Sequence, residues 1–542
     1  MQAERAAERL ERARRTLAGG RVPEAVELAG SVLADFPDSG PRLRAMALQL
    51  GGTALQIAGR PREAGDWARR GLRLAVVHAR EPRLVPALLG LMGETCQASG
   101  QLPRALVCFR HAERRFRELG EGNGVAAARA NAALVLLRQG ERDAARRDLV
   151  AAASGFSEAG NAREAARVRL ILADLLREAG DLEGTGSVID AAEAALHEHG
   201  GAELAVELSL RRGLLAEAAG RPADAEAPYA RALASADAAR LAPARPVVLA
   251  RLAELALLRG DGQAARAMLG EVVGHYRAGG ARLREAAASL AAAACDELDQ
   301  RFLDAEGWIL EADRIFAAAD DVRGRLAVRL ARARLSLAEG RGDLAGRQLR
   351  GVLDAAAGLP FPPAARAARG LLLGLRAQSG DAAGLPAEAE ALASEMRVHG
   401  EGTSAVHADA VREVALWLAE RRGRLVEEPR AWLEGLASAG FRALAREMLV
   451  LAAFAVRAAR ADDGLAAWGQ PLFRGADEGR WRDLEAVRCS LAGERPRAVP
   501  ADDAPLAGRF RAAEALRLGR RAPELSPPAV HAVVAAALAD FG

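Results

Sequence analysis

The sequence contains no lysine, so all 75 basic residues are arginine. Schiff-base catalysis and the lysine of a phosphate-binding P-loop both need an ε-amine, and this chain has none to offer. Basic and acidic residues nearly balance, at 75 against 72, and the formal net charge is +3. A chain with so small a charge excess has no electrostatic footprint for nucleic acid, so nucleic acid is not expected as a partner.

Cysteines, aromatic residues and long apolar runs are also scarce. Cys96, Cys108, Cys295 and Cys489 form no CxxC pair, and no histidine stands at ligand spacing from them, so we expect no metal and no cofactor. This cysteine usage fits a reducing, cytoplasmic setting. No apolar run approaches the roughly 18 residues of a membrane span, and the first residues lack the apolar core of a signal peptide.

Helix-forming residues are abundant instead, and they are punctuated by glycine at a regular interval. Aromatic residues make up only 4% of the chain, and Ala, Leu, Arg and Glu dominate over β-branched residues, which argues against a large sheet. Turn marks recur about every 40 residues, with Gln300 in one slot and Gly423 late in another. The regular marks are Gly20, Gly59, Gly100, Gly140, Gly180, Gly220, Gly260, Gly340 and Gly380. Each predicts the left-handed end of a helix, so the unit is two helices and two turns.

Two columns of small residues run in register with these marks. Seven residues before the mark stand Ala13, Gly52, Gly93, Ala133, Ala173, Gly213, Ala253, Ala293 and Ala333. Five residues after it stand Ala25, Ala64, Ala105, Ala145, Ala225, Ala265, Ala305 and Ala345, with Thr185 as the exception. Paired antiparallel helices approach to about 8–10 Å only where the side chains at their crossing are small. The columns therefore predict the crossing point of each helix pair.

A third column is apolar, and it is large at seven of its nine positions. Nine residues after the mark stand Ala29, Ala68, Phe109, Leu149, Ile189, Tyr229, Leu269, Ile309 and Leu349. Small residue, turn glycine, alanine and large apolar residue at these spacings resemble the tetratricopeptide repeat (TPR), and Pro37 matches the closing proline of that family. The period resembles the branch with 40-residue repeats that is found in signalling adaptors and bacterial regulators.

The resemblance implies an all-α fold, a right-handed superhelical α-solenoid of about 11 hairpins with an irregular helical cap. We expect the regular solenoid over residues 1–400 and degenerate, aromatic-richer helical repeats over 401–494. Prolines mark 495–505 as a linker or loop, and 506–542 as a short helical tail. Arginines cluster in that tail, either as a solvated helix face or as a contact for an acidic partner or nucleic acid.

The first-helix positions six and three residues before the mark are expected to line the inner surface. The polar residues there that we single out as candidate partner-binding residues are Glu94, Gln97, Asp174, Arg177, Glu217, Glu254 and Arg334. Leucines alternate with them, and apolar stripes flanked by charges suit an amphipathic helix or an extended peptide. The alternative is that these charges only solvate the inner wall.

A second candidate site is the aromatic-rich segment that contains Trp417, Trp432, Trp468 and Trp481. Such large side chains suit either an irregular capping bundle or an aromatic binding groove.

The sequence thus predicts a scaffold that binds proteins or peptides in the groove of a TPR superhelix. The alternative is the sensor arm of a bacterial signalling or transcription regulator whose effector domain is on another chain or was removed. No catalytic set is legible from spacing, and an enzyme is not expected.

Overall fold

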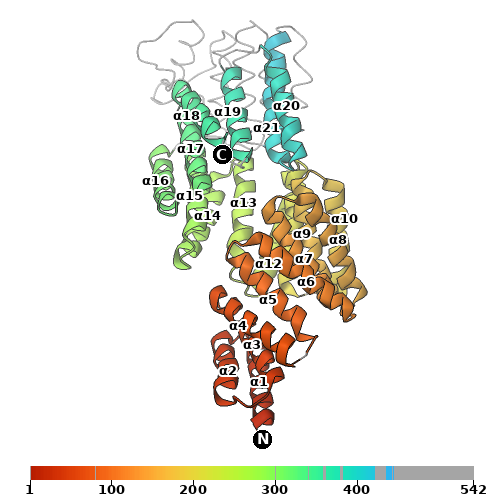
Figure 1. The fold of residues 1–542 in the computed structure, drawn as a ribbon. Coiled ribbons are helices and arrows are strands. Elements are labelled where there is room, and N and C mark those ends of the chain that lie inside the picture. Colours follow the sequence, from red (N-terminus) through yellow and green to blue (C-terminus); the bar gives the residue numbers. More distant parts are fainter. Residues whose placement is uncertain are drawn as a thin grey trace, which may run out of the picture. The chain divides into compact units, whose positions relative to one another are not determined.

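The computed structural model describes residues 2–79, 81–199, 201–299, 301–339, 341–357, 362–378 and 383–420, with 435, 436, 438–441 and 444. All regular elements in these ranges are helical (Figure 1). The first half holds α1 (Gln2–Ala18), α2 (Val22–Asp35), α3 (Pro41–Ile57), α4 (Pro61–Arg73), the π-helix η1 (Leu74–Ala79), α5 (Leu84–Ala98), α6 (Leu102–Glu118), α7 (Gly122–Gln139), α8 (Arg142–Glu158), α9 (Ala162–Glu178) and α10 (Leu182–His199). The second half holds α11 (Ala202–Ala218), α12 (Pro222–Ala238), α13 (Arg245–Arg259), α14 (Gly262–Ala278), α15 (Arg282–Leu298), α16 (Phe302–Ala318), α17 (Val322–Ala338), α18 (Gly342–Ala356), α19 (Pro362–Gln378), α20 (Leu385–Val398) and α21 (Gly402–Glu420).

The helices form successive antiparallel hairpins, which confirms the predicted α-solenoid of TPR-like units. The chain divides into two compact units. The first unit comprises Met1–Leu176 and Glu183–Leu204, and the second comprises Arg177–Leu182 and Ala205–Gly542. The domain boundary expected at residue 400 stays a prediction, because the segments beyond it lie largely outside the described residues.

The seven turn glycines within the described residues adopt the backbone conformation that their spacing predicts, whereas Gly340, Gly380 and Gly423 lie outside those residues. Gly140 has φ +84°, and the amide of the next residue, Glu141, donates to the carbonyl of Leu136 at 2.9 Å. This is the Schellman hydrogen bond that closes a helix end, and it needs a left-handed residue, which glycine supplies without a Cβ penalty. Arg240 and Asp320 take the same left-handed conformation at two later turns, with φ of +54° and +50°.

One repeat is one residue longer than the usual period of 40 residues, and the structure shows where the extra residue lies. The interval from Gly59 to Gly100 is 41 residues, and η1 lies within it as a direct continuation of α4. A π-helical turn accommodates one residue more than an α-helical turn does. The insertion is therefore absorbed inside the second helix of this hairpin, and the next turn glycine keeps its role.

The columns of small residues lie at the helix crossings, as predicted. Ala105 and Ala145 are both 0% exposed, and Thr185, the exception in its column, is buried as well. The large residues of the third column are buried against them: Phe109, Leu149, Ile189 and Tyr229 are each 0% exposed. A hairpin with a large third-column residue therefore buries that side chain of its second helix against a small residue of its first. The first two hairpins have Ala29 and Ala68 in this column instead.

The sizes of the two partners are matched. Aromatic Phe109 faces Gly93, where an added Cβ would lie 2.6 Å from the ring atom Cε1, and aromatic Tyr229 faces Gly213, where a Cβ would overlap the ring. Most hairpins with an aliphatic residue in the third column carry alanine instead, as in the pair of Ala133 and Leu149. Gly52, opposite Ala68, is an exception, because a Cβ there would lie 2.6 Å from Leu91 Cδ2. Glycine is thus required where the third-column residue is aromatic, because the distance between the two helices has to stay the same along the stack.

A double-mutant cycle tests this matching. Gly93→Ala introduces a methyl group where Phe109 leaves no room, which costs about 1–3 kcal/mol. Alanine regains about 1 kcal/mol of helix propensity, so we expect a net loss of stability in urea denaturation. In a Phe109→Leu background the same substitution should become neutral or stabilising.

The matched control is Gly270→Ala in α14, where an added Cβ meets nothing within 4 Å. That variant should gain up to about 1 kcal/mol. Equal effects of Gly93→Ala in both backgrounds would contradict the size matching.

Candidate inner-surface site

The predicted partner-binding residues divide between the two units. Glu94 and Gln97 on α5 and Asp174 on α9 belong to the first unit. Arg177, Glu217 on α11, Glu254 on α13 and Arg334 on α17 belong to the second. The structure brings Arg177, Glu217 and Glu254 into one electrostatic cluster, while a continuous ladder through all seven positions stays a prediction.

The centre of this cluster is Glu217, in the last turn of α11. Burial raises the pKa of Glu217 from 4.5 to about 7. The positive charges of Arg251 and Arg177 oppose this shift, whereas the negative charge of Glu254 adds to it. Glu217 is therefore a carboxyl group that ionises near neutral pH, at a position where the fold leaves it only partly exposed.

Arg251 and Tyr229 are two neighbours that adjust the pKa of Glu217 in this cluster. Arg251 Nη1 lies 2.6 Å from Glu254 Oε2, so its charge is shared with a second carboxylate one helical turn away. Tyr229 lies completely buried beneath, against Gly213. Burial and the nearby Glu217 both raise the pKa of Tyr229. The phenol of Tyr229 itself favours the charged carboxylate and lowers the pKa of Glu217, which partly offsets the rise caused by burial.

Sequence reasoning missed Arg251 and Tyr229 as members of this site. Arg251 stands three residues before Glu254 on α13, so the helical spacing of the two was a usable signal. Tyr229 carried no such signal, because its column predicts a packing residue. Its proximity to Glu217 depends on how α11, α12 and α13 stack.

A second charged pair lies further along the second unit. Arg334 Nη2 on α17 donates to Glu297 Oε2 on α15 at 2.9 Å. Burial raises the pKa of Glu297, and the charge of Arg334 partly offsets this rise. The first helices of neighbouring hairpins therefore meet in a partly buried ion pair, so Arg334 already has a structural partner.

The remaining candidates have separate surroundings. Burial raises the pKa of Glu94, which indicates a carboxyl group withdrawn from water. The backbone carbonyl of Gln97 accepts a hydrogen bond from Arg138 Nη1 at 3.1 Å. Of the alternative aromatic site, Trp417 lies on α21, while Trp432, Trp468 and Trp481 lie outside the described residues.

Metal sites and membrane-spanning helices are two other features that these ranges could contain. Within the described part of the chain, no group of three or more His, Cys, Asp or Glu side chains is arranged to hold a metal ion. None of the helices in these ranges combines the length and the apolar character needed to cross a bilayer.

The raised pKa of Glu217 makes stability depend on pH. Between the unfolded value near 4.5 and the folded value near 7, the folded state binds one more proton than the unfolded state. Stability conferred by the neutral carboxyl is therefore present below pH 4.5 and lost as pH rises through 7. Glu217→Gln should remove this loss, so its stability relative to wild type should rise across that window.

The measurement is urea denaturation of both proteins from pH 4.5 to 8. The difference between them isolates Glu217, since all other titrating groups are shared. A difference that stays constant over this range would show that Glu217 ionises normally.

Comparisons with known proteins find solved structures that are similar to this chain. No family model matches the sequence, and no curated protein matches it. The apo quorum sensor NprR from B. thuringiensis is 14% identical with TM-score 0.49, covering 65% of this chain and 99% of that one. The Cut9–Hcn1 hetero-tetramer of APC/C is 13% identical with TM-score 0.43, covering 96% and 94%.

A third similar structure is a signal transduction ATPase from Pyrococcus horikoshii that has a tetratricopeptide repeat sensor. It is 13% identical with TM-score 0.44, and the match covers 73% of this chain and 55% of that protein. The assignment of the fold rests on this chain's own hairpins, period and buried columns. They make it a solenoid of the tetratricopeptide kind.

Proposed function

We propose that this chain is an interaction scaffold that binds a protein or peptide segment on the inner surface of its second unit. In this proposal the cluster of Arg177, Glu217, Arg251 and Glu254 receives a cationic side chain of the partner. The observation that carries it is the carboxyl group of Glu217, whose pKa of about 7 leaves it poised between its neutral and charged forms.

The electrostatics favour a cation at this place. A positive group brought to Glu217 stabilises the ionised carboxylate and lowers its pKa, so binding and ionisation reinforce each other. Glu254 supplies a second negative charge, already directed by its contact with Arg251 at 2.6 Å. Arginine or lysine on the partner therefore satisfies the site better than an acidic side chain does.

Apolar neighbours supply the second half of the surface. Leu214 and Leu257 occupy the same repeat positions as Glu254 and Glu217 on adjacent first helices, and both are partly exposed. Leucine beside carboxylate is the pattern that an amphipathic segment with basic residues complements. A small metabolite would gain little from such a spread of contacts.

The three described cysteines are free, which agrees with a cytoplasmic setting for this scaffold. The alternative function, a sensor arm in a bacterial signalling or transcription regulator, uses the same binding surface. The two differ in what binding triggers, and genes adjacent to this one would distinguish them.

A charge reversal that conserves net charge tests the surface. Arg177→Glu with Glu217→Arg inverts the local pattern, so peptides selected by the wild-type protein from a displayed library should lose binding by tenfold or more. Circular dichroism of the same protein should be unchanged.

The matched control is Arg60→Glu with Glu63→Arg, an exposed ion pair at 2.6 Å in the first unit. It should leave both binding and helicity intact, since exposed pairs contribute little. Retained binding in the Arg177 and Glu217 double variant would contradict the proposal and show that these charges only solvate the inner surface.

A further inference from the structure

The turn between α20 and α21 packs on the backbone of helices that lie far earlier in the chain. Gly402 begins α21, and a Cβ there would overlap the carbonyl oxygen of Ala218 and lie 2.7 Å from the amide nitrogen of Gly220. Thr403 Oγ1 donates to the carbonyl of Glu217 at 2.9 Å, across 186 residues of sequence. So close an approach of two backbones requires glycine.

A second contact of the same turn repeats this arrangement one hairpin earlier. A Cβ on Gly400 would overlap the carbonyl oxygen of Arg177. Arg177 and Glu217 occupy the same position in successive repeats, three residues before the turn glycine. The α20–α21 turn therefore touches the backbone carbonyls of the two residues whose side chains enter the charged cluster.

Helix ends explain why this contact is attractive. The last carbonyls of α11 have no partner within their helix and carry partial negative charge. The N-terminal end of α21 carries partial positive charge, and its first residue, Gly402, lies against the carbonyl of Ala218. The hydroxyl of Thr403 gives the carbonyl of Glu217 a second donor, beside the amide of Gly220 at 2.9 Å.

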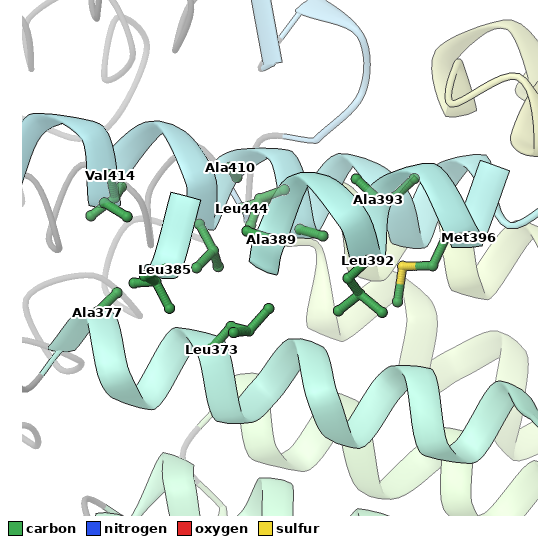
Figure 2. Packing of buried hydrophobic residues seen from close by; sticks show 14 of the residues in the cluster. Leu373, Ala377, Leu385, Ala389, Leu392, Ala393, Met396, Ala410, Val414 and Leu444 are labelled. Carbon is green, nitrogen blue, oxygen red and sulfur yellow. The ribbon is translucent and has the colours of Figure 1, made fainter. Parts of the chain in front are cut away.

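The docking turn is itself held firmly. Arg366 on α19 is 4% exposed, and its guanidinium makes two hydrogen bonds to the carboxylate of Glu401, the Nε bond at 3.0 Å. The helices around it share one core, in which Leu385, Leu392 and Val414 pack together with Leu444 (Figure 2). The turn is thus held by the core that α19, α20 and α21 share.

The contact with α11 and α12 extends beyond the Thr403 bond. The amide of Ala223 on α12 donates to the carbonyl of Ala439 at 3.2 Å. An added Cβ on Gly440 would lie 2.9 Å from the nitrogen of Ala223, and one on Gly220 would lie 3.2 Å from Val406 Cγ2. The turn is therefore fixed on α11 and α12 at several points.

We propose that the α20–α21 turn is a latch, which packs on the carbonyl ends of α9 and α11 and thereby positions the side chains of Arg177 and Glu217. The main chain and the side chain of Glu217 face the latch and the cluster respectively. Movement of one is therefore transmitted to the other through a single residue. This coupling does not require that the cluster bind a peptide, so it stands apart from the proposed function.

Gly402→Val tests the latch, because the added side chain occupies the space of the Ala218 carbonyl. The amide of Ala223 is the reporter: it lies in the first turn of α12, where amides have no partner within the helix, and its bond to Ala439 crosses the contact. We expect its hydrogen exchange to become at least tenfold faster, with far-UV circular dichroism unchanged. The pKa of Glu217, followed by carboxyl-labelled NMR, should fall toward 4.5 as water reaches it.

The matched control is Gly270→Val, a helical glycine with nothing within 4 Å of an added Cβ. It should alter neither readout. Thr403→Val, which removes the hydroxyl at constant shape, should speed exchange at Ala223 more than Thr403→Ser, which keeps it.

Unchanged exchange at Ala223 in Gly402→Val would overturn the latch. Faster exchange with an unchanged pKa of Glu217 would overturn its coupling to the cluster. Failure of the proposed function would show instead in the peptide selection, which neither readout uses.

Discussion

The separation of the two helices in each hairpin is the constraint on which the rest of this structure depends. Successive hairpins stack in register only if every pair crosses at a similar distance. Alanine meets an aliphatic side chain at most crossings, and glycine meets an aromatic ring at Gly93 and Gly213. The regular stack that results brings Arg177, Glu217 and Glu254 within electrostatic reach of one another from three different first helices.

The hairpins were predictable from sequence because their determinants are local. Gly140, Ala145 and Leu149 lie within ten positions, and each residue type indicates its own place. Glycine takes the left-handed turn, alanine fits the helix crossing, and leucine fills the core. Inner-surface positions such as Glu217 followed from the same register. Their ionisation did not, because the pKa of Glu217 depends on its burial in the stack and on Arg251 and Tyr229 from two further helices.

Contacts across the solenoid lay beyond such reasoning. Nothing near Thr403 in the sequence identifies the carbonyl of Glu217 as its partner, because 186 residues separate them and the approach depends on the summed geometry of many stacked hairpins. Gly402 looks like an ordinary helix-start glycine, and only the structure shows that another backbone lies against it. The aromatic-rich segment after Trp417 lies largely outside the described residues, so both interpretations of it stay open.

The matched sizes within hairpins bear on how such a chain can grow by duplication of its gene. The hairpin of α11 and α12 contains both Gly213 and Tyr229, so a copy of it carries its own complementary pair. The hairpin of α5 and α6 is different, because Phe116 on α6 packs against Gly124 on the following helix, α7. A recombination event that separated α6 from α7 would set a ring against a Cβ. Permitted crossover points are therefore unevenly spread along a repeat array that looks uniform.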